Sequence, residues 1–246
     1  MDNKIGLEFF EKTKYEYLEI SPQKNGISLP DLQLPKTKGA QTSSLPKVDE
    51  IKPDIDSFIE LVNQRETLRQ YSNESLDLYE LAYLLWATQG VKTITDYPLT
   101  KRTVPSAGSR HPFETYLLVN LVKGLESGLY RYLAVEHKLE KIPTPGDINE
   151  RITEGCLKQK HVADSAVTFI WVAVPIRTVW RYSQRGYRYM LLDAGHVCQN
   201  LYLAAESIEC GVCAIAAYDD DLVNRALGLD GENLFAIYLA SLGKRK

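Results

Sequence analysis

A long helix predicted between residues 184 and 207 is the feature that most limits how this chain can fold. Apolar residues recur in it at steps of three and four, and a second apolar row lies beside the first. The first row comprises Tyr187, Leu191, Ala194, Cys198, Leu201 and Ala205, and the second comprises Met190, Val197 and Ala204. A helix with so little polar circumference must be buried on more than one side. In a domain of this size, that pattern indicates a subunit interface.

Residues 166–174 are almost continuously apolar and rich in β-formers, which predicts a strand covered on both faces at the centre of a sheet. A helix that carries Phe58 to Val62 and runs into Arg65 is expected earlier in the chain. Further strands are predicted at 117–121, 128–134, 138–142, 212–218 and 233–242. A further helix is predicted to follow either Asn73 or Ser75 and to stop at Gly90, and two more are predicted at 148–157 and 219–227. We assign these elements to one domain, residues 51–246.

Residues 1–50 have a different character, because their apolar residues are scattered without a period. Prolines at 22, 30, 35 and 46 interrupt the stretch. It is therefore predicted to be an extended N-terminal arm that either binds a partner or wraps its own dimer. The sequence of the arm does not distinguish between these two roles.

The composition excludes several classes of partner. Of the 246 residues, 44% are hydrophobic and 25% are charged, as in ordinary globular proteins. A net charge of −3 gives no reason to expect nucleic acid or an anionic membrane as a partner. The N-terminus is charged, and no run of roughly 18 apolar residues exists, so we expect a cytoplasmic protein without a membrane span.

Three segments could carry chemistry. The first is RETLR, in which Arg65, Thr67 and Arg69 could present two guanidinium groups and a hydroxyl to one phosphate. A charged helix end that pairs with Glu66 or Glu60 is the alternative.

The second segment is RTVPSAGSRHPFE, residues 102–114. Two prolines bracket small residues, which gives a rigid loop whose backbone can approach a flat ligand closely. Arg102, Arg110 and His111 add hydrogen-bond donors. A purely structural loop is the competing interpretation.

The third segment alternates arginine with aromatic residues from Trp180 to Tyr189 and leads into Asp193 and His196. A packing surface or a pocket wall is favoured over a nucleic-acid surface, given the overall acidity of the chain. A buried structural histidine is favoured over a catalytic base for His196. No Rossmann glycine motif, phosphate loop, zinc-protease motif or hydrolase elbow is present.

A pair of cysteines, Cys210 and Cys213, has the spacing of a redox dithiol or of half a zinc site. The chain contains two further cysteines, but they do not form a second such pair, and His111 and His196 lack ligand-like spacing. No metal is therefore expected.

Together and in this order, RETLRQYS, RTVPSAGSRHPFETYL and YRYMLLDAGHVCQNLYLAA resemble the FMN-dependent nitroreductase superfamily, and most of all its SagB-type dehydrogenase branch. The resemblance extends from about residue 55 to the C-terminus, and more loosely to GLEFFEKTKY. It implies an α+β, three-layer fold with a central mixed sheet flanked by helices. It also implies an intertwined homodimer with FMN at the interface.

The resemblance further implies a set of site residues. Arg65, Thr67 and Arg69 would hold the FMN phosphate and ribityl chain, although the family often has arginine where this chain has Glu66. The loop of the second subunit would lie against the flavin ring, Gly211 would sit in the turn beside the flavin pocket, and the C-terminal basic residues would reach the phosphate. The loop residues are Pro105, Ser106, Ala107 and Gly108, and the C-terminal residues are Lys244 and Arg245.

The implied activity is hydride transfer through flavin N5, with reduction of nitro- or quinone-type small molecules by NAD(P)H favoured. The alternative is oxidation of azolines in peptide maturation, for which the family pattern has a Lys-Tyr pair where this chain has Arg181 and Tyr182. Since arginine is a poor base, Tyr182 or His111 would have to take the proton. A scaffold that has lost catalysis is a third interpretation.

Overall fold

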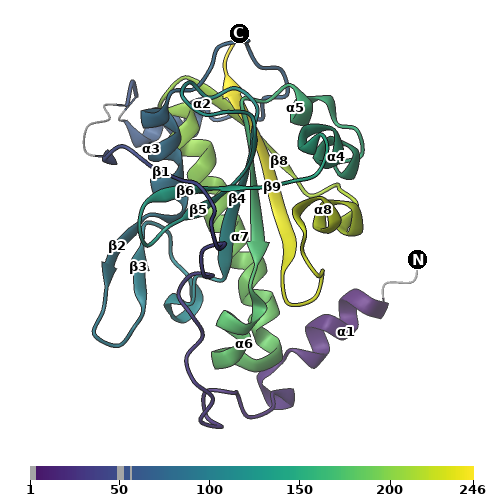
Figure 1. The fold of residues 1–246 in the computed structure, drawn as a ribbon. Coiled ribbons are helices and arrows are strands. Elements are labelled where there is room, and N and C mark those ends of the chain that lie inside the picture. Colours follow the sequence, from purple (N-terminus) through teal and green to yellow (C-terminus); the bar gives the residue numbers. More distant parts are fainter. Residues whose placement is uncertain (1–3, 49–52, 56) are drawn as a thin grey trace.

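The computed structural model describes residues 4–48, 53–55 and 57–246. Its centre is a seven-stranded sheet with the strand order β1-β6-β5-β4-β7-β9-β8 (Figure 1). These strands are β1 Thr42–Ser44, β4 Phe113–Val119, β5 Gly128–Leu133, β6 Lys138–Ile142, β7 Val167–Ala173, β8 Cys210–Ile215 and β9 Phe235–Lys244. A separate hairpin pairs β2 (Val91–Ile94) with β3 (Thr100–Arg102). The predicted boundary between residues 50 and 51 lies outside the described residues.

Pairings between named strands of the large sheet are antiparallel. A parallel bridge joins Thr67 to Val212 at the outer edge of β8, and a second joins Leu76 to Val122. The sheet is therefore mixed only at its margins, where the segment after α2 (Phe58–Gln64) runs beside β8.

Helices cover both faces of the sheet and make the fold a three-layer α+β structure (Figure 1). On one side lie α3 (Leu78–Gln89) and α7 (Gly186–Glu206), and on the other lie α4 (Ile148–Gly155), α5 (Lys160–Ala163) and α8 (Asp220–Leu227). Helix α3 begins with a capping box, in which Asp77 is the N-cap and Glu80 lies in the first turn. This N-cap lies two residues beyond Ser75, the later of the two predicted starts.

Strand β7 divides the core, as its apolar sequence predicted. All seven of its residues are buried. Phe169 and Trp171 pack with the α3 and α7 side, whereas Ile170 and Val172 pack with the α4 and α8 side. Because successive side chains of a strand point to opposite faces, a strand between two helical layers must be apolar throughout.

Helix α7 packs one face against the sheet and leaves another apolar face uncovered. Met190 and Leu201 are fully buried. Leu191 and Leu192 are 56% and 61% exposed, and Gly195 beside them has open space where a Cβ would lie. The double-sided burial expected from the sequence is thus incomplete within a single chain.

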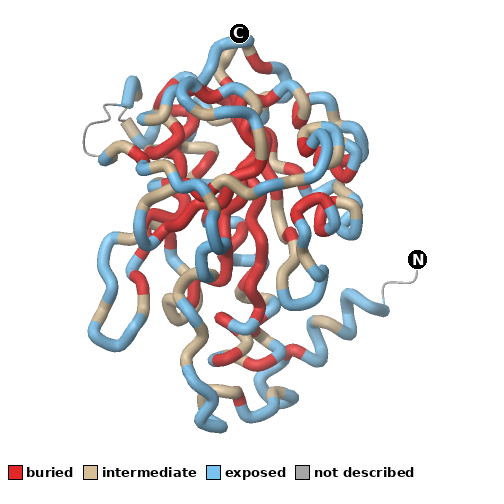
Figure 2. The backbone as a smooth tube through the Cα atoms, in the orientation of Figure 1, coloured by how far each residue is buried: buried red, intermediate tan, exposed pale blue. Residues whose placement is uncertain are grey.

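The N-terminal arm contains more structure than its sequence suggested. Helix α1 (Lys4–Lys12) projects from the body of the protein near α6 (Pro175–Tyr182) and has no buried residue (Figures 1 and 2). A short 3₁₀ turn follows at Tyr15–Tyr17. Strand β1 then pairs with β6 at the edge of the sheet. The apolar residues of α1 lack a partner in the core, which explains why no folded element was expected there.

Buried charges hold the extended part of the arm on its own chain. Glu114 of β4 forms an ion pair with Arg177 of α6, and both side chains are under 5% exposed. The Leu34 amide donates to the same carboxylate at 2.8 Å, and Arg177 Nε donates to the Asp31 carbonyl at 2.9 Å. The arm therefore wraps its own chain and satisfies buried groups that the sheet cannot.

A second buried pair repeats this arrangement one strand further out. Arg131 of β5 and Glu140 of β6 are 2.7 Å apart and are 5% and 0% exposed. Arg131 also donates to the Pro35 carbonyl at 2.7 Å, and the Thr37 amide donates to Glu140. Within the described residues, no helix is both long and apolar enough to cross a membrane.

Replacing Glu114 by alanine should destabilise the protein by about 3–5 kcal/mol, because Arg177 would be left as a buried, uncompensated charge. Urea unfolding followed by circular dichroism measures this loss. The matched control is Glu136→Ala, which removes the more exposed pair between Glu136 and Lys36 of the arm and should cost less than about 1 kcal/mol. Equal losses for the two variants would contradict the role given to burial.

Candidate functional site

The predicted phosphate segment lies along the outer edge of β8. The Leu68 amide donates to the Val212 carbonyl at 2.9 Å. Thr67 Oγ1 lies 3.2 Å from Tyr202 Oη, and Arg65 Cζ lies 5.4 Å from the centre of the Tyr202 ring. Tyr202 belongs to α7, so this helix gathers the predicted phosphate ligands at the sheet edge.

Two glycines allow this segment to lie flat on the sheet. A Cβ on Gly211 would fall 2.4 Å from Leu68 Cδ2, and one on Gly243 would fall 2.7 Å from Tyr71 Cγ. Contacts that short do not occur between real atoms. The absence of a side chain at Gly211 thus allows Leu68, between Thr67 and Arg69, to pack directly against β8.

Both C-terminal basic residues are paired with carboxylates of their own chain. Arg245 donates to both oxygens of Glu206 at 2.7 and 2.8 Å, and its other terminal nitrogen lies 3.0 Å from Glu66. Lys244 pairs with Glu80. Glu66, which departs from the family pattern, therefore has a partner here. Arg65, which is half-buried, and Arg69, which is exposed, remain as the cations beside Thr67.

The small-residue loop is anchored to α7 by Asp193, whose role the sequence did not reveal. Ser106 Oγ donates to Asp193 at 2.6 Å, and the Ala107 amide donates to the same carboxylate at 3.3 Å. The His111 amide in turn donates to Ser106 Oγ at 2.9 Å. Burial raises the pKa of Asp193, while these two donors oppose the shift. The exposed Pro105 begins the loop.

Gly108 brings the loop against the predicted catalytic pair. Its φ of +59° lies in the left-handed region, where glycine costs least. A Cβ there would fall 2.5 Å from Tyr182 Oη and 3.1 Å from Arg181 Cδ. Arg110 donates to the Gly108 carbonyl at 3.1 Å and stacks over Trp180. Residues from two distant segments therefore meet at this glycine.

His111, also predicted as a catalytic candidate, is buried, with 4% of its surface exposed. Burial, with a smaller contribution from the Arg102 charge, lowers its pKa to about 3. The Thr100 backbone is its hydrogen-bond partner. His111 is therefore a neutral side chain beneath the loop, whereas Arg181 and Tyr182 line a pocket.

The two groups of predicted residues meet α7 at different points. Asp193 holds the loop, and Tyr202 holds the phosphate segment, nine residues further along the helix. At 1.5 Å per residue, the two points are about 14 Å apart along the helix axis. Within one chain, the loop and the phosphate segment therefore contact α7 at two separate points.

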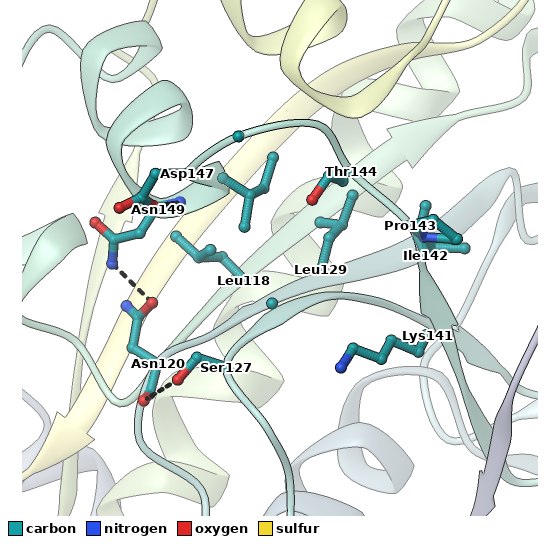
Figure 3. Close-up of a pocket in the computed structure, with 13 residues that line it drawn as sticks. Leu118, Asn120, Ser127, Leu129, Lys141, Ile142, Pro143, Thr144, Asp147 and Asn149 are labelled. Atoms are coloured by element: carbon teal, nitrogen blue, oxygen red, sulfur yellow. Dashed lines mark hydrogen bonds between the residues drawn. The ribbon is translucent and has the colours of Figure 1, made fainter.

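A further pocket of about 400 Å³ lies away from all of these residues (Figure 3). It opens between the β5–β6 hairpin and the start of α4. Asn120 accepts a hydrogen bond from Asn149 at 2.7 Å, and Lys141 pairs with Glu126. None of the residues that line this pocket is a predicted site residue.

All four cysteines are free and buried. Burial raises the pKa of Cys156, Cys198 and Cys210 to about 12 and also raises the pKa of Cys213. The described residues contain no cluster of three or more side chains that could hold a metal ion. Cys210 and Cys213 therefore act as packing residues of β8.

We expect none of these thiols to react with Ellman's reagent in the native protein at pH 8, because each stays protonated and buried below its raised pKa. Unfolding in guanidinium should release four thiols per chain. Absorbance of the released thiolate measures both states. One or two thiols that react rapidly before unfolding would restore the redox interpretation of the Cys210–Cys213 pair.

Comparison with known proteins agrees with this architecture. Residues 62–244 match the Nitroreductase family. The chain is 33% identical to MJ1384 of Methanocaldococcus jannaschii, named as a nitroreductase, over 74% of this chain and 87% of that protein. It is also 29% identical to the trifolitoxin-processing protein TfxB of Rhizobium leguminosarum and 24% identical to the microcin B17-processing protein McbC of Escherichia coli. These two matches cover 63% and 58% of the chain, but only 43% and 54% of those proteins.

Solved structures show the same fold. A nitroreductase-type protein of Ralstonia eutropha has a TM-score of 0.66 at 19% identity, covering 89% of this chain and 97% of its own. A chain of the E. coli microcin synthetase McbBCD complex, with truncated pro-MccB17 bound, has a TM-score of 0.62 at 16% identity, and the match covers 98% of this chain and 92% of that one. An NADPH:FMN oxidoreductase of Vibrio harveyi, complexed with NAD+, has a TM-score of 0.53 at 14% identity, and the match covers 76% of this chain and 68% of that one. From the family match and the sequence relatives, the chain belongs to the nitroreductase family.

Proposed function

We propose that the protein is an FMN-dependent oxidoreductase, related to the SagB-type dehydrogenases, that reduces nitro- or quinone-type small molecules with NAD(P)H in the cytoplasm. The observation that carries the proposal is the contact of Arg181 and Tyr182 with Gly108, which joins a cation and a hydroxyl to the small-residue loop. Family membership supports the oxidoreductase class.

The chain's donor groups fit FMN. Arg65, Thr67 and Arg69 share one edge of the sheet, and two guanidinium groups with a hydroxyl suit a phosphate. Ser106, Ala107 and Gly108 form a rigid loop without bulky side chains, which suits a flat ring. Bound FMN would supply hydride transfer at N5 of its ring. Lys244 and Arg245 could reach the phosphate only by leaving Glu80 and Glu206.

The chemistry of Arg181 favours reduction over azoline oxidation. Arginine is a hydrogen-bond donor and a poor base, so it is unsuited to taking a proton from carbon. A fixed positive charge beside a tyrosine hydroxyl instead stabilises the negative charge that develops on the oxygen of a nitro group or quinone during reduction. His111 is buried and neutral, so it offers no accessible base in place of the missing lysine.

A homodimer would bring the two groups of predicted residues together across its interface. Within one chain the phosphate segment and the loop meet α7 about 14 Å apart. The exposed apolar face of α7, with Leu191, Leu192 and Gly195, lies on the helix that carries both anchor points. A second copy that covers this face would bring the loop of one chain toward the phosphate segment of the other.

The first test of the proposal is the spectrum of the purified protein. We expect bound FMN, bleached by NADPH or NADH without oxygen and recoloured by a nitroaromatic or quinone. Arg65→Met should weaken FMN affinity about 10- to 100-fold, because a charge-assisted hydrogen bond is worth about 1.5–3 kcal/mol. Fluorescence titration with FMN measures this. Glu60→Met, on the preceding helix, serves as the matched control and should leave the affinity unchanged.

Other outcomes would decide between the remaining functions. Bleaching by an azoline-containing peptide but not by nicotinamide would contradict the reductase assignment and support azoline oxidation. That second candidate is favoured by the likeness to McbC and TfxB, which are named for peptide processing. A colourless protein that binds no FMN at micromolar concentration would support a non-catalytic scaffold.

The dimer has its own test. Leu191→Glu places a charge on the exposed apolar face of α7 and should convert a dimer into a monomer, with loss of bound FMN. Sedimentation velocity measures the mass, and flavin absorbance measures the loss. Lys38→Glu, an exposed change on the arm, should remain dimeric. A monomeric wild-type protein that retains its FMN would exclude a site shared between two chains.

A further inference from the structure

The N-terminal arm forms one wall of a pocket at the end of α6, although the arm lies outside the stretch that matches the family. The pocket has a volume of about 310 Å³. Its lining includes Tyr15, Leu18, Ile20 and Lys24 from the arm and Arg181 and Tyr182 from α6. Side chains of the arm therefore help to determine which molecules the pocket admits.

The arm is fixed on both sides of this pocket. On one side, Arg185 donates to the Thr13 carbonyl at 2.8 Å and stacks over Tyr15, with its Cζ 4.4 Å from the ring centre. On the other side, the Gln23 amide donates to the Trp180 carbonyl at 2.8 Å. The lining residues between these anchors are held in place, which a selective pocket requires.

The pocket borders the candidate active site. Tyr182 lines it and also lies against Gly108, where an added Cβ would meet its hydroxyl at 2.5 Å. Arg181 lines it as well, with its side chain beside the same glycine. A molecule in the pocket would therefore contact the two side chains proposed to assist reduction.

The charge of the pocket is positive, in contrast to the net charge of −3 of the whole chain. Lys24 and Arg181 contribute two exposed cations, and Glu19 contributes one carboxylate. Leu18 and Ile20 add apolar surface. This combination suits a ligand with an anionic group on a flat, apolar body.

We propose that this pocket selects substrates in which a carboxylate is attached to the planar electrophilic group, and that Lys24 of the arm determines this specificity. The inference rests on the proposed function for its reaction, but the preference in binding is separate from turnover. Lys24 stands on the arm, whereas Arg181 also serves the reduction, so the two cations are separable by substitution.

The test compares para-nitrobenzoate with para-nitrobenzamide, which have nearly the same size but differ in charge. The wild-type protein should prefer the benzoate about fivefold in kcat/KM, since one exposed ion pair contributes up to about 1 kcal/mol. Lys24→Glu should abolish or reverse this preference while bound FMN stays unchanged. The same charge change at Lys38→Glu, outside the pocket, should preserve the preference.

Isothermal titration calorimetry with both compounds separates this inference from the reductase assignment. If neither compound is reduced, the proposed function fails, but tighter binding of the benzoate that Lys24→Glu removes would still support the pocket. Equal binding and equal kcat/KM for the two compounds in the wild type would overturn the inference. A preference that survives in Lys24→Glu would also overturn it.

Discussion

The buried carboxylate of Glu114 is the point on which the arm and the candidate site both depend. It accepts from Arg177 of α6 and from the Leu34 amide of the arm, so one charge fixes a helix and an irregular segment together. Helix α6 ends in Arg181 and Tyr182. An ion pair buried to this degree is costly unless further polar partners accompany it, and the arm backbone supplies one donor and one acceptor, which leaves Arg177 Nη1 without a hydrogen-bond partner among the described residues. The arm is therefore part of the folded domain in energetic terms, even though it precedes the family match.

Regular elements with strong apolar periodicity could be predicted from the sequence, because burial imposes that period. Strand β7 and helix α7 were found within two residues of their predicted ends at each terminus. The β2–β3 hairpin and helix α6 were not predicted. In α6, arginines stand among apolar residues, and two of its polar side chains, Arg177 and Thr178, are buried, so the helix lacks a clear apolar face in the sequence. From sequence alone, Arg177 is expected at the surface, because its ion-pair partner Glu114 lies 63 positions away in the chain.

The same limit applies to the site. Local sequence predicted Arg65, Thr67 and the loop before β4 as site residues, because arginine pairs and small-residue turns are short-range patterns. It could not show that Asp193 holds the loop or that Glu206 and Glu66 pair with Arg245, because these contacts join segments far apart in the chain. Asp193 lies within the predicted helix 184–207, and its isolation on a largely apolar surface is the signal that the sequence offers.

In the proposed function, Arg181 would link the direction of the reaction to the choice of substrate. A lysine at this position could lose its proton and act as a base, whereas an arginine can only donate hydrogen bonds and positive charge. At this position the pocket would therefore offer a permanent donor suited to receiving negative charge, rather than a base. Lys24 extends the same positive potential onto the arm. Arg181 and Lys24 line the same pocket, so their two positive charges would together attract anionic electrophiles to it. In the proposed function, the arginine of α6 and the lysine of the arm would thus act on the same substrate, one on its reduction and the other on its selection.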